Sequence, residues 1–180
     1  MDRQPVLEGE LLLLRPLAAE DWEALLAVAR DPKVWEQHPI PDRWQEDVFR
    51  GYFDDAMAQG GALVATLRTD HRIVGCSQYR PTPFDPDAIE IGWTFLACQY
   101  WGGTTNHAMK WLMLRHAFES LPRVLFRIGE TNVRSRTAME RIGGRLTDLV
   151  ENSEYQGRQV RHVVYEITRD NFAFGPLQTG

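Results

Sequence analysis

Three short segments carry the side chains best suited to chemistry, and they follow one another along the chain. Glu90 is the single carboxylate in the alternating run AIEIGWTFL. The turn QYWGGTTN runs from Gln99 to Asn106, and Asn132 begins the segment NVRSRTAMERIGG, which also contains Ser135. A carboxylate held among apolar side chains has a raised pKa and is suited to accept a proton. The spacing therefore indicates a candidate base beside two polar helix starts.

The glycine turn permits two interpretations. The N–H groups at a helix start carry partial positive charge and bind phosphate oxygens, and Gly102 and Gly103 let the backbone approach such a ligand. Thr104 either adds a hydroxyl donor or simply caps the helix. The helix that follows is apolar around most of its circumference, which places its start at the middle of the domain. Together with Asn132 at the mouth of the next strand–helix unit, it suits an elongated ligand with phosphates at one end.

The spacing of the hydrophobic residues predicts the strands and helices that position these groups. Strand patterns cover 10–17, 88–96, 123–130, 145–152 and 158–168, with a hairpin over 62–80, and helix patterns cover 18–32, 44–60, 104–119 and 132–144. In the strand at 88–96 the alternation predicts one face made of Ile89, Ile91, Trp93 and Phe95. The order β-α-α-β-β-β-α-β-α-β-β predicts a single α/β domain over 1–174, with a loose tail at 175–180.

Composition argues against several classes of protein. A formal charge of −5 does not suit a protein that coats nucleic acid. The LLLL run at 11–14 is too short for a signal core or a membrane span, so we expect a soluble, cytoplasmic protein without a membrane partner. Cys76 and Cys98 fit no metal spacing and no disulfide framework. We therefore expect reduced thiols and no metal.

These segments resemble the GNAT superfamily of N-acetyltransferases, and within it the Rim-type branch of ribosomal-protein N-terminal acetyltransferases. The resemblance covers nearly the whole chain. IEIGW resembles the strand that carries the pantetheine arm of coenzyme A, QYWGGT resembles the Q/R-x-x-G-x-G/A pyrophosphate loop, and NVRSRTAMERIGG resembles the N-x-x-S helix ending in a K/R-x-G turn. The resemblance implies a mixed, mostly antiparallel, twisted sheet of about seven strands flanked by about four helices, with central parallel strands that splay apart.

The resemblance also implies acetyl-CoA as cosubstrate. Its binding positions would be Phe95, Leu96, Ala97, Gln99, Trp101, Gly102, Gly103, Thr104, Thr105, Asn106, Asn132 and Arg136. The loop departs from the family pattern at Thr104, where relatives have glycine or alanine, so we expect its hydroxyl or Asn106 to contribute to the phosphate site. Arg134 and Arg141 are further candidates for the 3′-phosphate, with a solvated helix face as the alternative for at least two of the three arginines.

Acetyl transfer from a thioester to an amine needs a proton acceptor, a polarised carbonyl and a donor for the departing thiolate. Glu90 matches the glutamate proposed as base in Rim-type relatives, with a solvated surface role as the alternative. Glu130 is the second candidate, with a helix-start carboxylate near Asn132 as its alternative. Ser135 takes the thiolate role by its match to the Rim branch. A backbone N–H between Thr94 and Ala97 would polarise the carbonyl. Plain capping by Asn132 and Ser135 is the structural alternative.

The function indicated is direct transfer of acetyl from acetyl-CoA to a primary amine, either a protein N-terminus or a small metabolite. Trp22, Trp35 and Trp44 lie in the predicted acceptor region, where they form either an aromatic lid or ordinary core. A non-catalytic acyl-CoA-binding module is the main rival. A nucleotide-binding module is a weaker one, because the turn has neither Gly-Lys-Ser/Thr nor G-x-G-x-x-G. The chain is expected to be a monomer or homodimer.

Overall fold

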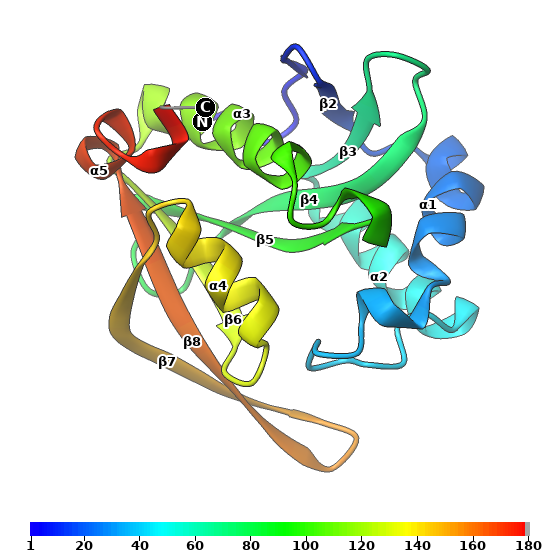
Figure 1. Ribbon diagram of the computed structural model, residues 1–180. Coiled ribbons are helices and arrows are strands. Elements are labelled where there is room, and N and C mark those ends of the chain that lie inside the picture. Colours follow the sequence, from blue (N-terminus) through cyan, green and yellow to red (C-terminus); the bar gives the residue numbers. More distant parts are fainter. Residues whose placement is uncertain (179–180) are drawn as a thin grey trace.

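Eight strands form one mixed sheet in the order β1-β2-β3-β4-β5-β6-β8-β7 (Figure 1). The computed structural model describes residues 1–178. The strands are β1 (Leu7–Glu8), β2 (Leu12–Pro16), β3 (Ala62–Leu67), β4 (Ile73–Pro81), β5 (Ala88–Leu96), β6 (Arg123–Gly129), β7 (Arg145–Tyr155) and β8 (Arg158–Thr168). The helices are α1 (Trp22–Ala29), α2 (Glu46–Gln59), α3 (Thr104–Ser120), α4 (Val133–Arg141) and α5 (Arg169–Ala173). Every neighbouring pair is antiparallel except β5 and β6, which are parallel.

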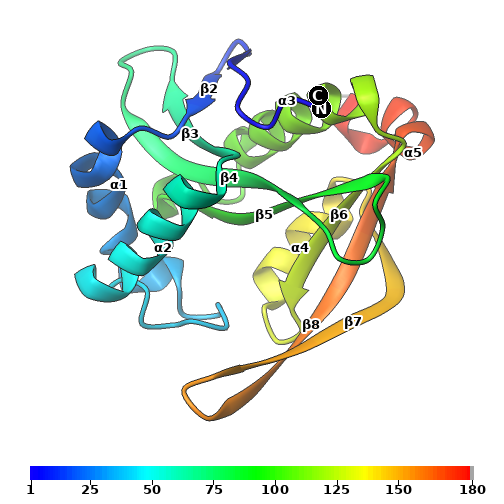
Figure 2. The ribbon, with the colours of Figure 1, turned by 180° about the vertical axis from the view of Figure 1, so that it is seen from behind.

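The sheet carries a separate hydrophobic core on each face. Helices α1 and α2 cover one face, and α3 and α4 cover the other (Figure 2). Met109, Leu112 and Met113 of α3 pack in the first core, and Leu25, Leu26 and Phe49 of α1 and α2 pack in the second. Helices α1 and α2 therefore bury the apolar stripe that their sequence period predicts, and the sheet is covered on both sides.

The predicted fold class is confirmed, with small differences in the count of elements. The structure has one more strand and one more helix than expected. The two residues of β1 are too few to show a period, and α5 is a five-residue helix capped by Thr168, whose side chain accepts from the N–H of Asn171. Helix α2 begins at Glu46, so Trp44 precedes it and is exposed.

The C-terminal segment also differs from the expected loose tail. Leu177 is only 3% exposed and packs in the core beneath α3 and α4. Residues 176–178 form a single 3-10 turn. Thr179 and Gly180, the rest of that expected tail, lie outside the described residues.

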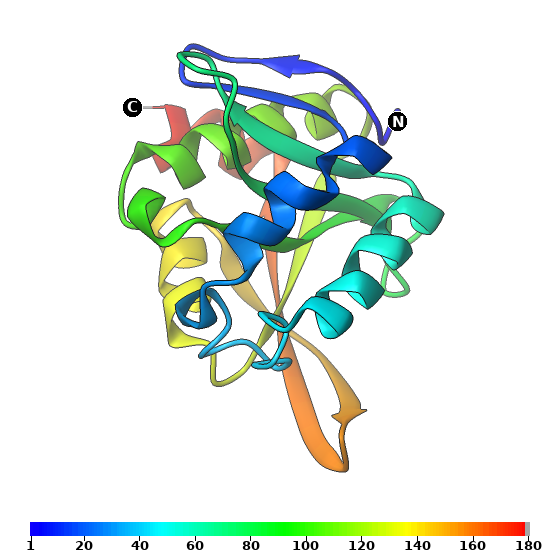
Figure 3. The same cartoon turned by 90° about the vertical axis from the view of Figure 1, so that its right-hand side faces the viewer.

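The β7–β8 hairpin extends away from the helical layers (Figure 3). Its turn is tied to the segment between α1 and α2, because Tyr155 donates a 2.8 Å hydrogen bond to Asp42. Gln156 donates a second one of 3.0 Å to the same carboxylate. The hairpin and the α1–α2 segment therefore border the same end of the sheet. Within residues 1–178, no helix combines the length and apolarity needed to cross a membrane.

Candidate active site

The sheet opens between its two parallel strands. β5 pairs with β6 only from Ala88 to Glu90, opposite Arg123 to Leu125. Beyond that point β6 continues against β8, and β5 continues against β4 up to Leu96. The predicted splay is therefore confirmed, and it begins directly after Glu90. Beyond Glu90, the facing edges of β5 and β6 no longer pair with each other.

A bulge in β5 changes which side chains face each side of the sheet. Trp93 has a φ of 51°, and the β4–β5 register shifts between Cys76 and Gln78. Ile91 therefore packs on the α3 side, whereas Phe95 packs with α1 and α2. The prediction that Ile89, Ile91, Trp93 and Phe95 share one face is wrong beyond Ile91, because a bulge offsets the two-residue period.

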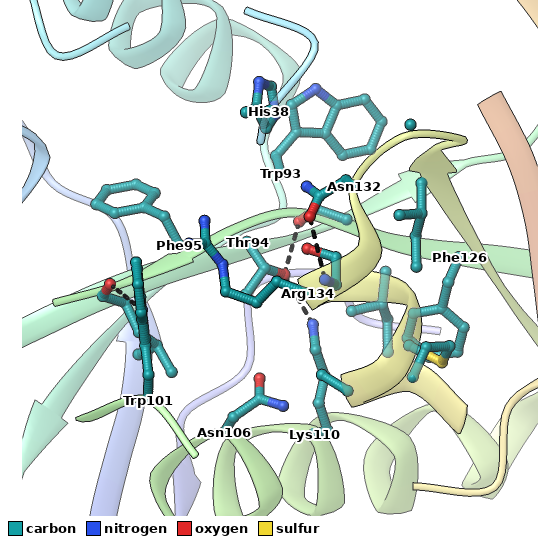
Figure 4. Close-up of a pocket in the computed structure, with 18 of the residues that line it drawn as sticks. His38, Trp93, Thr94, Phe95, Trp101, Asn106, Lys110, Phe126, Asn132 and Arg134 are labelled. Carbon is teal, nitrogen blue, oxygen red and sulfur yellow. Dashed lines mark hydrogen bonds between the residues drawn. The ribbon is translucent and has the colours of Figure 1, made fainter. Parts of the chain in front are cut away.

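A cleft of about 400 Å³ occupies the opening. It is bounded by β5, β6, α3, α4 and the segment after α1 (Figure 4). Eight of the predicted site residues line it: Phe95, Leu96, Trp101, Gly102, Gly103, Asn106, Asn132 and Ser135. The other six do not: Glu90, Ala97, Gln99, Thr104, Thr105 and Arg136. Among the described lining residues there is no aspartate or glutamate.

The glycine turn presents an uncapped helix start to this cleft. α3 begins at Thr104 with Gly103 as its N-cap, and no side chain caps it. The alternative of a threonine cap is therefore not what the structure has. Trp101 fixes the turn, since its indole N–H donates to the carbonyl of Leu96 at 3.0 Å. The Arg134 guanidinium lies 3.9 Å from the centre of the Trp101 ring, so a cation stands beside the turn.

The start of α4 faces the same space. Asn132 is buried and is the N-cap, and its side-chain oxygen accepts from the N–H of Ser135 at 3.1 Å. Capping and lining the cleft are thus compatible for Asn132. Arg136 points elsewhere and donates to the Tyr165 hydroxyl and the Glu130 carbonyl, both at 3.0 Å. Two helix starts, but not Arg136, therefore meet at the cleft.

Glu90 lies behind the wall of the cleft. It is 3% exposed, which excludes a solvated surface role, and its carboxylate accepts from Arg127 Nε at 3.2 Å. Burial raises the pKa of Glu90, and the Arg127 guanidinium opposes this rise. Arg127 also pairs with Glu151 and does line the cleft. The second candidate, Glu130, pairs at the surface with Arg161 at 2.5 Å.

Sequence reasoning passed over Lys110. Its side chain is 5% exposed, lines the cleft, and donates to Thr94 Oγ1 at 2.7 Å and to Ser77 Oγ at 3.3 Å (Figure 4). Burial lowers the pKa of Lys110 to about 7. A signal was present, because Lys110 stands between Met109 and Trp111 in a mostly apolar helix and lies one turn after Asn106 and His107.

Comparison with known proteins identifies the family. A family model described as an acetyltransferase (GNAT) domain matches residues 12–145, which is most of the chain. The chain belongs to the GNAT acetyltransferase family. The matched residues include the glycine turn, both helix starts and the β5–β6 opening, and the resemblance stated from the sequence is confirmed at this level. No curated protein sequence matches this GNAT domain.

Solved structures share the fold. A GNAT-family acetyltransferase from Bacillus anthracis is 20% identical, with a TM-score of 0.75 over 92% of this chain and 99% of that one. An acetyltransferase from Agrobacterium tumefaciens str. C58 is 24% identical, with a TM-score of 0.69 over 92% and 95%. Mycobacterium smegmatis RimJ, solved with CoA-disulfide, is 19% identical, with a TM-score of 0.69 over 93% and 86%. These likenesses concern the fold of the GNAT domain.

The aromatic residues of the first helices are mainly structural in this GNAT domain. Trp22 stacks on Phe49 with ring centres 5.7 Å apart, inside the core under α1 and α2. Trp35 is buried there as well, but it also lines the cleft. Trp44 is exposed. Of the three tryptophans, only Trp35 therefore reaches the site.

His38 makes the folding stability of the GNAT domain sensitive to acid. It lines the cleft, its Nδ1 accepts from the N–H of Ile40 at 2.9 Å, and burial lowers its pKa to about 3. The unfolded chain binds this proton near pH 6.5, at about the ordinary histidine value. The stability that neutral His38 confers is therefore complete above that pH and is lost as the pH falls towards 3.

We expect the parent protein to lose more stability between pH 7 and pH 5 than His38→Gln, by up to about 2 kcal/mol. Urea unfolding at both pH values measures this difference. His71→Asn is the matched control, because His71 is exposed and its φ of 59° is one that asparagine tolerates. Equal losses for the parent and His38→Gln would show that His38 titrates freely in the folded state.

Proposed function

We propose that the cleft binds acetyl-CoA and that the protein transfers the acetyl group directly to a primary amine. The observation that carries this proposal is the opening between β5 and β6, bordered by an uncapped, glycine-led helix start and by Asn132. In a GNAT-family chain this is the place for the pantetheine arm. Support also comes from RimJ, a structural neighbour that was solved with CoA-disulfide.

The charges around the cleft suit a ligand with phosphates. No described lining residue is acidic, whereas Arg134 and Arg141 contribute cations from α4. We assign the pyrophosphate to the turn at Gly102 and Gly103, with Asn106 as a side-chain donor, because helix-start N–H groups bind phosphate oxygens. We assign the nearby arginine role to Arg134 in place of Arg136, because Arg134 stacks on the turn. Thr104 stays a predicted contributor at the first position of α3.

The free edge of β5 supplies backbone groups for the arm and the thioester. Phe95 and Leu96 follow the bulge and lie next to the glycine turn, whereas the N–H of Ala97 already donates to the carbonyl of Val74 at 2.9 Å. An extended arm can pair with such an edge much as a strand would. A backbone N–H in this stretch would then polarise the thioester carbonyl, as an oxyanion-hole donor does. Asn132 and Ser135 face the arm from the start of α4.

The reaction proposed is a single displacement at the thioester carbonyl. The neutral amine attacks, the C–N bond forms, the C–S bond breaks, and the amine loses one proton. Glu90 remains the proposed proton acceptor, since it is the buried one of two carboxylates that contact Arg127. Its raised pKa makes it a better base than an exposed glutamate. Glu90 does not itself line the cleft, whereas its ion-pair partner Arg127 and its strand neighbour Gly92 do, so the proton would have to travel from the cleft to the carboxylate behind these residues.

The acceptor would enter from the side of α1 and α2. Trp35, His38 and Trp93 line the cleft on that side, and each presents an aromatic ring to the entering amine. The Trp93 ring also has two guanidinium groups near it, Arg80 at 3.9 Å and Arg127 at 5.6 Å. The acceptor classes that we propose are a protein α-amino terminus, a polyamine and an amino-acid-like metabolite.

The test is thiol release from acetyl-CoA with a panel of such amines. We expect amine-dependent release, and we expect Glu90→Gln to lower kcat/KM by about 10²-fold or more, a typical loss for a proton-transfer group. Glu130→Gln is the matched control and should stay within a few-fold of the parent. Calorimetric binding of CoA, measured in parallel, separates the alternatives. Tight CoA binding with no amine-dependent release would favour the non-catalytic acyl-CoA-binding module.

A further inference from the structure

Lys110 occupies an unusual place in the molecule. The chain has only two lysines. Lys33 is exposed, whereas Lys110 extends from α3 beneath the bulge of β5 to the floor of the cleft (Figure 4). A buried ammonium is costly unless something compensates it. No described carboxylate forms an ion pair with Lys110, and none lines the cleft. Packing therefore does not explain why a lysine is buried at this position, whereas a function of its ammonium group would.

Within residues 1–178, the hydrogen bonds of Lys110 use two of its three N–H donors. An ammonium carries three N–H donors. Two of them are used on Thr94 Oγ1 and Ser77 Oγ, which lie 2.7 Å from each other. The Thr94 hydroxyl is also 3.3 Å from the Gly92 carbonyl, so its own hydrogen has an acceptor. These hydroxyls hold Lys110 in place while its third donor remains for a group bound in the cleft.

The arginines and two of the histidines that line the cleft do not replace Lys110 as a source of protons. Arg127 of β6 and Arg134 and Arg141 of α4 line the same cleft, but a guanidinium is too weak an acid to act as a proton donor in proteins. Three histidines also line the cleft, His107 on α3, His38 after α1 and His162 on β8, and the buried thiol of Cys76 on β4 interacts electrostatically with Lys110. Burial lowers the pKa of both His38 and His162, so these two are neutral near pH 7.

We propose that the Lys110 ammonium donates the proton that the departing thiolate takes up. This inference rests on the proposed acetyl transfer. As the C–S bond breaks, the sulfur accepts a proton from Nζ and leaves as the free thiol of CoA. Neutral Lys110 then regains a proton from water, which balances the one that the acceptor amine releases. Lys110 would thus perform the step that the sequence assigned to Ser135.

The acidities of the groups favour this assignment. A free thiol has a pKa of about 8.5, so proton transfer to its thiolate from a group that titrates near 7 is downhill. Burial places the pKa of Lys110 at about 7. A serine hydroxyl remains protonated over the whole working range, so Ser135 can donate a hydrogen bond to the sulfur but does not supply the proton. An arginine at position 110 would hold its proton too tightly.

The test compares Lys110→Met with the control Lys33→Met. We expect Lys110→Met to lower kcat by about 10²- to 10³-fold, while calorimetric CoA binding stays within about threefold, and we expect Lys33→Met to match the parent. Lys110→Arg retains the positive charge and should stay as slow as Lys110→Met. Recovery of kcat to near the parent value in Lys110→Arg would overturn proton donation in favour of charge alone. Loss of CoA binding together with kcat in Lys110→Met would overturn it in favour of a structural role.

A pH profile tests the proton itself. With an acceptor amine that is already neutral at pH 6, kcat of the parent should fall as the pH rises through about 7. This alkaline limb should be absent from Lys110→Met, and Thr94→Val should move it to lower pH by removing a partner of the charged form. An unchanged limb in Lys110→Met would contradict the assignment. Absence of amine-dependent release from the parent would instead contradict the proposed acetyl transfer.

Discussion

Gly75→Ala is expected to lower the free energy of unfolding by about 3 kcal/mol or more, because overpacking against backbone has no cheap relief. A Cβ on Gly75 would lie 2.1 Å from the carbonyl oxygen of Phe95 and 2.8 Å from a methyl group of Leu96. The carbonyl belongs to the β5 backbone, so the two strands would have to separate. Chemical denaturation of the purified variant measures the effect.

Gly51→Ala is the matched control for this glycine. Gly51 lies inside α2, is exposed, and has no atom within 4 Å of the position of an added Cβ. Alanine there should raise the stability by about 0.5–1 kcal/mol through helix propensity. If Gly75→Ala and Gly51→Ala differed by less than about 1 kcal/mol, the close contact between β4 and β5 would not be a rigid one.

The close contact matters for the site as well as for stability. Gly75 lies opposite Leu96, directly after the bulge at Trp93. Of the two neighbouring strands, only β4 therefore pairs with the stretch of β5 that faces the cleft, since β6 has already diverged. We expect any folded fraction of Gly75→Ala to bind CoA more weakly than the parent, because the free edge of β5 would shift.

The sequence predicted the order of the main elements because that order rests on strong local signals, whereas the splay was implied only by the family resemblance. Period-2 and period-3.6 runs identify strands and helices wherever one face is buried. The bulge left no such signal. A tryptophan at positive φ is held by the tertiary contacts of β4 and β5. Gly92 precedes it, but the positive φ falls on Trp93 and not on that glycine. The face assignment therefore failed at Trp93 although the strand was correct.

The arginines of α4 show a second limit of prediction from the sequence. Residues two positions apart on a helix point about 200° away from each other, so Arg134 and Arg136 do not face the same side. Which one faces the ligand depends on how α4 is rotated on the sheet. The family pattern gave no basis for that choice, and the structure turns Arg134 towards the cleft. Lys110 is missed for a related reason. The apolar residues of α3 predict a core helix, and the sequence does not show what the one buried charge of this helix contacts.

Arg127→Met is expected to be the other strongly destabilising change, at about 3–5 kcal/mol near neutral pH. Arg127 is the ion-pair partner of Glu90, which is 3% exposed, and methionine would leave that carboxylate buried without a counter-charge. Arg161→Met is the matched control. Its pair with Glu130 lies at the surface, with side chains 51% and 41% exposed, and such pairs contribute about 1 kcal/mol or less.

The pH dependence identifies the cause of the loss. Burial already raises the pKa of Glu90, and removing Arg127 raises it further, so the folded variant binds a proton more readily than the unfolded chain does. The penalty is therefore largest where Glu90 is ionised, and it shrinks as the pH falls towards the ordinary glutamate value of about 4.3. The double variant Glu90→Gln/Arg127→Met should recover much of the stability at neutral pH, because neither buried charge remains. A loss that is independent of pH, or no larger than that of Arg161→Met, would mean that Arg127 acts through its packing and its contact with Glu151.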